Sequence, residues 1–192
     1  MNSQAQPRAE SAPSAVVGSA SVTLGNAPSP ENGYQPADER GPAQNVPKPV
    51  RPEGMNEETA EGLEKFILYW NDCVNYGIQT GDFSYAEPLV SQDYTADLEL
   101  YVWAEEVYAR GGWVVGGRRE VVLNKDALAE QGNGVYRWIG NLNVEDMQAY
   151  LNEPGTIVDG SQTRGRSVYF QATYKDEKWV MDIVAFAEAF PS

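Results

Sequence analysis

Residues 57–82 constrain the fold most, because they predict one long amphipathic helix. In EETAEGLEKFILYWNDCVNYGIQTGD, apolar residues recur every three or four positions, which places them on one stripe of an α-helix. The stripe consists of Leu63, Phe66, Ile67, Trp70, Val74 and Gly77. Asn56 is the predicted N-cap, and Gly81 is predicted to end the helix in a left-handed conformation. Such a helix needs a surface to cover its stripe, and the rest of the chain is expected to supply one.

Residues 1–52 predict a disordered leader. They hold nine of the 12 prolines and a single aromatic residue, Tyr34, among Ala, Ser, Gly, Asn and Gln. A segment of this composition buries too little apolar surface to offset its chain entropy. It lacks the basic start and apolar core of a signal peptide. We interpret it as an inert, solvated leader or as a tether that holds a folded domain, residues 53–192, away from a surface.

Composition excludes several classes of function. The net charge of −14 and the pI near 4.3 argue against nucleic acid and anionic lipid as partners, since both require a basic face. There is no run of about 18 apolar residues that would span a membrane. With no histidine and one cysteine, the chain has no Ser-His or Cys-His pair, no disulfide and no thiolate zinc cage. We therefore expect no metal and no cofactor, and an unknown small molecule or protein as partner.

A second helix is predicted over residues 93–110, before Gly111 and Gly112. Its inner face is predicted to hold Tyr94, Leu98, Tyr101, Val102, Tyr108 and Ala109. The carboxylates are predicted to lie largely on the solvated outer face: Asp97, Glu99, Glu105 and Glu106. Clustered carboxylates also suit a divalent cation, but they lack EF-hand spacing.

From Trp113 onward the apolar period changes to two, which predicts strands. The predicted strands are residues 113–117, 118–124, 135–144, 166–175 and 179–186. Residues 125–134 are predicted as a polar connection and residues 147–160 as a long loop, with turns at Asn133-Gly134 and Asp176-Glu177. Helices followed by antiparallel strands predict an α+β fold, with a curved sheet against the first helix.

A family resemblance rests on FILYWNDCVNYGIQTGD, on VYARGGWVVGG and on the paired strands at the end. These features resemble a family of uncharacterised actinobacterial lipoproteins, whose folded part is similar to the nuclear-transport-factor-like, cystatin-like α+β cone. The resemblance covers residues from about 53 to 190. It implies an extracytoplasmic protein anchored through a lipidated cysteine upstream of residue 1. The chain departs from the family in residues 91–100, which lack the family's cysteine pair.

The cone fold implies a sheet that curls around the first helix and leaves a cavity at its wide end. Asp182 is the one candidate catalytic residue, because it interrupts an otherwise apolar strand and burial there would raise its pKa. The alternative is that Asp182 faces solvent or pairs with Arg137 or Arg166. The candidate cavity-lining residues are Tyr69, Tyr76, Tyr101, Trp138 and Tyr169.

Three functions are compatible with the sequence. The first is a non-enzymatic, envelope-associated binding or interaction domain on a flexible tether. The second is a small cavity isomerase or hydratase that uses Asp182 and a tyrosine as its acid and base. The third is a homodimerisation module joined through an exposed sheet face. A pocket that holds a buried Asp182 beside a tyrosine hydroxyl would favour the enzyme.

Overall fold

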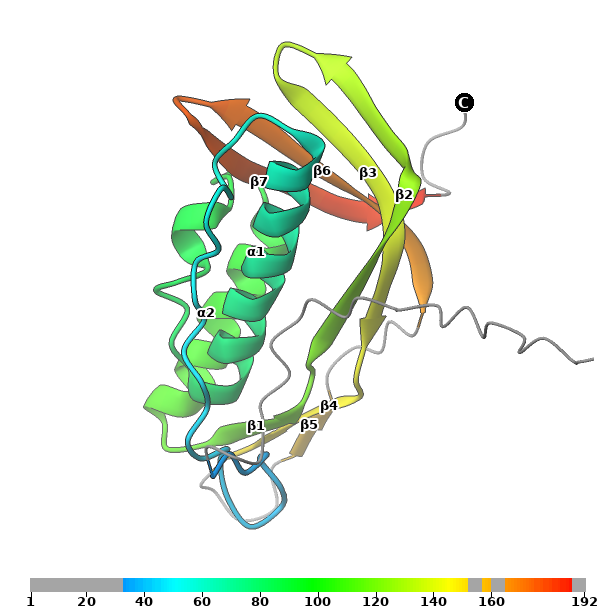
Figure 1. Cartoon of the computed structure of the whole chain (residues 1–192). Coiled ribbons are helices and arrows are strands. Elements are labelled where there is room, and N and C mark those ends of the chain that lie inside the picture. The colour runs from blue at the N-terminus through cyan, green and yellow to red at the C-terminus, as the bar shows by residue number, and fades with distance from the viewer. Residues whose placement is uncertain (1–32, 152–156, 160–164, 188–192) are drawn as a thin grey trace, which may run out of the picture.

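Two helices pack against two antiparallel sheets, so the predicted α+β class is confirmed. The computed structural model describes residues 33–151, 157–159 and 165–187. The helical elements are α1 (Ala60–Thr80), the 3-10 turn η2 (Glu87–Leu89) and α2 (Thr95–Ala109). The strands are β1 (Trp113–Gly116), β2 (Arg119–Gly132), β3 (Val135–Val144), β4 (Met147–Tyr150), β5 (Ile157–Asp159), β6 (Arg166–Lys175) and β7 (Lys178–Phe186). Figure 1 shows the helices on one side of the sheets.

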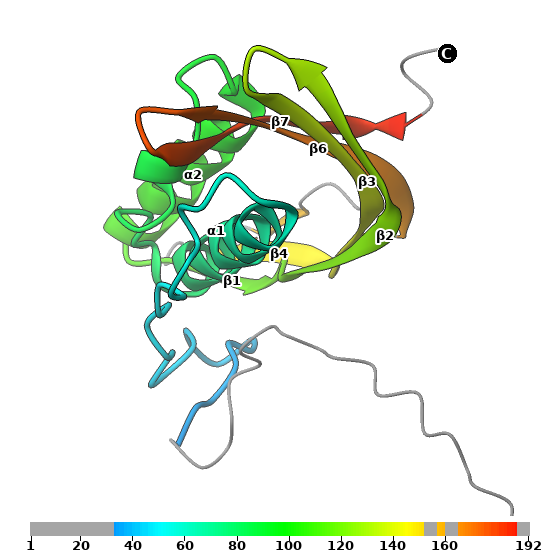
Figure 2. The same ribbon diagram turned by 45° about the horizontal axis from the view of Figure 1, so that its top comes forward.

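The larger sheet has the order β2-β3-β6-β7, and the smaller one has the order β1-β4-β5. Strands β2 and β7 are open edges of the larger sheet, which therefore does not close on itself. In Figure 2 its strands curve around α1. The core lies between them and contains Phe66, Trp70 and Phe170, each no more than 1% exposed.

Helix α1 is shorter at its start than predicted. Its N-cap is Thr59, whose side chain accepts a hydrogen bond from the amide of Gly62 at 3.0 Å. The prediction of Asn56 as the cap was wrong, because a threonine three residues later satisfies the helix amide. The end was predicted correctly, since Gly81 has φ +76° and its amide donates to the carbonyl of Gly77.

Helix α2 is rotated relative to its predicted orientation. Asp97 is 3% exposed and Val102 is 54% exposed, so both were placed on the wrong face. Tyr101 was placed correctly and is 1% exposed. The physical reason is Arg119 on β2, which binds Asp97 in the interior and so turns this carboxylate inward.

A sharp bend joins the two sheets. The ladder of the β2-β3 pair continues into the β1-β4 pair through hydrogen bonds from Gly117 to Asp146 and from Glu145 to Arg118. Gly116 and Gly117 have φ of +73° and +74°. A Cβ on Gly116 would lie 1.9 Å from the carbonyl oxygen of Asp146, so the bend requires glycine there.

The two segments predicted as connections contain strands. Residues 125–132 continue β2 to the hairpin turn at Asn133-Gly134, and β4 and β5 lie within residues 147–160. Both predictions of irregular structure were wrong because these strands carry polar residues and lack clear alternation. The strands β3 and β6 have the predicted bounds, and Asp176-Glu177 forms the predicted turn.

Residues 33–52, which we name the N-terminal arm, run along α1 (Figure 1). The hydroxyl of Tyr34 donates to Oε1 of Gln79 at 2.5 Å, near the end of α1. The indole N–H of Trp113 donates to the carbonyl of Asp38 at 2.8 Å. The arm, which the sequence assigned to the leader, therefore has defined contacts with α1 and β1. Residues 1–32 of the predicted leader lie outside the described residues.

Within the described part of the chain, neither helix is long and apolar enough to cross a membrane.

Candidate functional site

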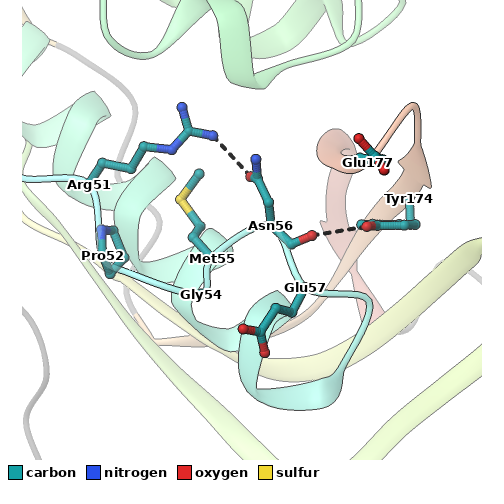
Figure 3. Close-up of a pocket in the computed structure, with 8 residues that line it drawn as sticks. All are labelled: Arg51, Pro52, Gly54, Met55, Asn56, Glu57, Tyr174 and Glu177. Carbon is teal, nitrogen blue, oxygen red and sulfur yellow. Dashed lines mark hydrogen bonds between the residues drawn. The ribbon is translucent and has the colours of Figure 1, made fainter.

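A hollow at the entry to α1 is the candidate site, and we name it the Arg51 pocket (Figure 3). It is open to solvent and has a volume of about 510 Å³. One wall is the loop before α1 and the other is the hairpin between β6 and β7. It is lined by Arg51, Pro52, Gly54, Met55, Asn56, Glu57, Tyr174 and Glu177.

Hydrogen bonds hold the two walls of the pocket together. Asn56 accepts at its side-chain oxygen from Arg51 at 2.9 Å and at its carbonyl from the Tyr174 hydroxyl at 3.0 Å. The indole N–H of Trp179 donates to the carbonyl of Glu57 at 3.0 Å. The pocket is therefore fixed by bonds between segments that lie more than 100 positions apart in the chain.

Aromatic rings support the hairpin side of the pocket. The ring centroid of Trp179 lies 4.9 Å from that of Tyr174 and 5.1 Å from that of Tyr136, in edge-to-face geometry. Trp179 is 2% exposed, which anchors the group in the core. The Tyr136 hydroxyl donates to Glu58 at 3.3 Å, and burial, followed by the charges of Glu130 and Glu58, raises the pKa of Tyr136.

Gly54, in the lining of the pocket, has a left-handed backbone conformation. Its φ is +75°, and a Cβ there would lie 3.2 Å from Oε1 of Glu57 and 3.3 Å from Nζ of Lys65. A larger residue would be strained and would crowd both charged groups.

Charges of both signs line the pocket. Figure 3 shows Arg51 on one side and Glu177 on the other, with Asn56 between them. The neighbouring cation Lys65 is bound by Glu61 at 2.7 Å, and Lys125 is bound by Glu64 at 2.6 Å. Among the described residues, neither Glu57 nor Glu177 forms a salt bridge.

A second group of polar residues lies in the interior, and we name it the buried polar cluster. It consists of Asn71 and Asn75 on α1, Tyr94, Asp97 and Tyr101 on or before α2, and Arg119 on β2. Arg119 donates to Asp97, and the Tyr101 hydroxyl donates to Asp97 at 2.9 Å. The side-chain amides of Asn71 and Asn75 donate to the carbonyl of Arg119 at 3.1 and 2.8 Å.

The buried polar cluster shifts the pKa values of several of its members. Burial by itself would lower the pKa of Arg119, but the Asp97 carboxylate more than offsets this and raises it. Burial, and then the charge of Asp97, raises the pKa values of Tyr94 and Tyr101. The Arg51 pocket is not lined by any member of this cluster.

Comparison with known protein families shows which family the chain belongs to. A profile described as a family of unknown function, DUF6318, matches residues 32–185. The chain belongs to this family. The match includes the N-terminal arm, so the DUF6318 region begins before the predicted domain boundary at residue 53. No curated protein matches the chain.

Four of the five residues predicted to line a cavity are core residues of the DUF6318 domain. Trp138 donates its indole N–H to the carbonyl of Asn124, and Tyr101 belongs to the buried polar cluster. Tyr69 is 9% exposed, and burial followed by its neighbour Cys73 raises its pKa to about 12. Tyr169 is 6% exposed, with the guanidinium of Arg137 over its ring at 5.2 Å.

The fifth residue, Tyr76, is half-buried and packs edge-to-face on Tyr85. None of the five predicted residues lines the Arg51 pocket.

Asp182 lies at a β-bulge. Gln171 pairs with Ile183 and Ala172 pairs with Met181, so Asp182 is the extra residue on β7. Its Oδ2 accepts from the Thr173 hydroxyl at 2.6 Å, and it is partly exposed. The two arginines predicted as its partners make other contacts: Arg137 donates to Gln171, and Arg166 lies over the ring of Phe186.

Sequence reasoning missed the Arg51 pocket because its walls come from two distant segments. The available signal was local: Gly54 lies among polar residues before a helix, and Asp176-Glu177 forms a turn. No group of His, Cys, Asp or Glu among the described residues has a metal-binding arrangement.

Proposed function

We propose that the DUF6318 domain is a non-catalytic binding domain that recognises its ligand in the Arg51 pocket. The observation that carries this proposal is the pocket itself, in which hydrogen bonds fix walls from two distant segments around about 510 Å³. Small-molecule sites in proteins have volumes of about 300–1,000 Å³ and are largely pre-formed. A pocket already held open by its own hydrogen bonds fits this description.

The enzyme alternative has no comparable support. It requires Asp182 beside a tyrosine hydroxyl in a pocket, and Asp182 instead binds Thr173 on a partly exposed strand. Asp182 does not line the Arg51 pocket.

The binding proposal is tested by blocking the pocket. Glu177→Trp introduces a large ring at the pocket lining, and Asp176→Trp is its control, because the two residues share a turn and have φ of +58° and +52°. A set of small polar compounds and short peptides is screened by thermal unfolding against the full chain. We expect the compounds that stabilise the unmodified chain to stabilise Asp176→Trp equally and to lose their effect on Glu177→Trp. Equal stabilisation of both variants, or no stabilising compound at all, would refute the proposal.

We further propose that the domain has the cystatin-like cone fold and belongs to an envelope lipoprotein. Support for the fold comes from the curvature of the larger sheet around α1 (Figure 2). Support for the location comes from the composition of residues 1–52 and from the family resemblance of the sequence. Protease added to intact cells should degrade the protein while a cytoplasmic control survives, and full protection would exclude this location.

Dimerisation is a second candidate, because apolar side chains are exposed on the larger sheet. Val122 is 48% exposed and Ile139 is 41% exposed, and both line a hollow of about 160 Å³. Light scattering of the full chain at low and high salt tests this candidate, since salt screens the repulsion between chains of net charge −14. A dimer that Ile139→Lys dissociates would support it, and a monomer at every concentration would exclude it.

A further inference from the structure

We propose that the ligand of the Arg51 pocket is a short basic peptide, with a cationic side chain or amino terminus at Glu177 and a carbonyl or carboxylate at Arg51. This inference rests on the proposed binding function and adds the chemical class of the ligand. Three features of the protein support it: the carboxylates without salt bridges at the pocket, the donors on the opposite wall, and the field of the whole chain.

Two carboxylates at the pocket are available to a cation. The neighbouring cation Lys65, whose Nζ lies close to Gly54, is already bound by Glu61. Glu57 and Glu177 line the pocket and form no salt bridge with any residue that the structure describes. An ammonium or guanidinium group is the ligand chemistry that such carboxylates bind with charge-assisted hydrogen bonds.

The loop wall, opposite Glu177, carries hydrogen-bond donors. One terminal nitrogen of the Arg51 guanidinium donates to Asn56, and a guanidinium carries five N–H donors in a fixed fork. Figure 3 shows this guanidinium at the rim of the pocket, beside the Asn56 amide. Arginine and amide groups are donors to carbonyl and carboxylate oxygens, which every peptide carries.

The size of the pocket and the charge of the chain both suit a basic peptide. A volume of about 510 Å³ is in the range that holds a drug-sized or short-peptide ligand. The net charge of −14 attracts cations and repels anions before contact. Both effects favour a basic peptide over an acidic one.

The experiment measures the affinity of the full chain for trilysine by isothermal titration calorimetry. The other probes are trilysine with all amines acetylated, triglutamate, and spermidine as a free polyamine without carbonyls. Glu177→Gln removes one pocket charge, and Asp176→Asn is the matched control because it removes the same charge from the same turn outside the pocket lining. Arg51→Gln tests the carbonyl side.

We expect trilysine to bind the unmodified chain and Asp176→Asn equally and to bind Glu177→Gln roughly two- to fivefold more weakly, as expected for loss of one exposed charge pair. The acetylated peptide and triglutamate should not bind. Arg51→Gln should weaken trilysine and leave spermidine unchanged, which separates a peptide from a free amine.

Equal loss in Glu177→Gln and Asp176→Asn would overturn the inference, because it would indicate diffuse attraction to an acidic chain. Spermidine binding that exceeds trilysine binding would also overturn it. A further outcome is that trilysine shows no binding while another compound binds the unmodified chain and does not bind Glu177→Trp. In that case the basic-peptide class is wrong and the binding function stands. If no compound binds in either experiment, the binding function itself fails.

Discussion

Both terminal nitrogens of the Arg119 guanidinium donate hydrogen bonds to Oδ1 of Asp97, each at 3.1 Å. The Arg119 side chain is 12% exposed and the Asp97 side chain is 4% exposed. The pair joins β2 to α2 across the interior. It also lies near Trp70, with the guanidinium carbon 5.9 Å from the centre of its ring. Removal of either charge leaves the other without compensation in a largely buried site.

We therefore expect Asp97→Asn and Arg119→Met each to lower the free energy of unfolding by about 3–5 kcal/mol. The double variant should lose less than the sum, because neither charge is then buried alone. Glu99→Gln, on the exposed side of the same helix, is the control and should change stability by less than about 0.5 kcal/mol. Urea unfolding measures all four, and strict additivity would contradict the pairing.

The bend between the sheets gives a second prediction. Gly116→Ala should destabilise the chain strongly, since its Cβ would lie 1.9 Å from a backbone oxygen. Gly132→Ala is a matched control, because Gly132 has φ +88° and nothing lies within 4 Å of the place that an added methyl group would occupy. The control should cost about 1–2 kcal/mol for the left-handed backbone alone, and Gly116→Ala should cost at least about 2 kcal/mol more. Similar costs in chemical denaturation would argue against the close approach at Asp146.

Stability should fall at alkaline pH. Burial is the largest cause of the raised pKa values of Tyr69, Tyr108 and Cys73, each to about 12, and of the further rises at Tyr94 and Tyr101. The folded chain thus holds protons that the unfolded chain releases near pH 9 for the thiol and pH 10 for the phenols. Their contribution is complete below about pH 9 and is lost as the pH rises toward 12.

Urea midpoints at several pH values, together with tyrosinate absorbance, check this expectation. The midpoint should decrease steadily above about pH 9, and the buried tyrosines Tyr69, Tyr94, Tyr101 and Tyr108 should ionise only as the chain unfolds. A midpoint that stays constant or increases over this range would contradict it.

The bulge at Asp182 yields a mild prediction. Thr173→Val removes the hydroxyl that donates to Asp182, and it should cost about 0.5–1.5 kcal/mol, the usual net value of one hydrogen bond. Asp182→Asn keeps an acceptor and should cost less. Neither change should alter ligand binding at the Arg51 pocket, because neither residue lines it. A loss above about 3 kcal/mol in Asp182→Asn would indicate a buried carboxylate instead.

The alternation of apolar and polar residues and the turn residues predicted the strands that carry both signals. Strands β3 and β6 alternate clearly, and their turns contain residues that accept positive φ, such as Asn133 and Asp176. The second half of β2 was missed because its side chains are mostly exposed and polar, so no alternation marks it.

The errors at Asp97 and at the Arg51 pocket have a different cause. A helical wheel places Asp97 with the other carboxylates, and only the position of Arg119 on a distant strand turns it inward. The Arg51 pocket likewise depends on the contact of Tyr174 with Asn56, which no local pattern contains. Sequence periodicity identifies which faces of the helices and strands are apolar. The buried ion pair and the pocket depend instead on which distant segments come into contact.

The N-terminal arm also determines how the domain would bear load. A force applied through residue 33 would first act on the contacts of Tyr34 with Gln79 and of Trp113 with Asp38, both remote in sequence from Arg51. These hydrogen bonds would have to break before tension reached the loop that carries Arg51 and Asn56. A pull through residue 33 would thus leave the walls of the Arg51 pocket in place until these two hydrogen bonds had broken.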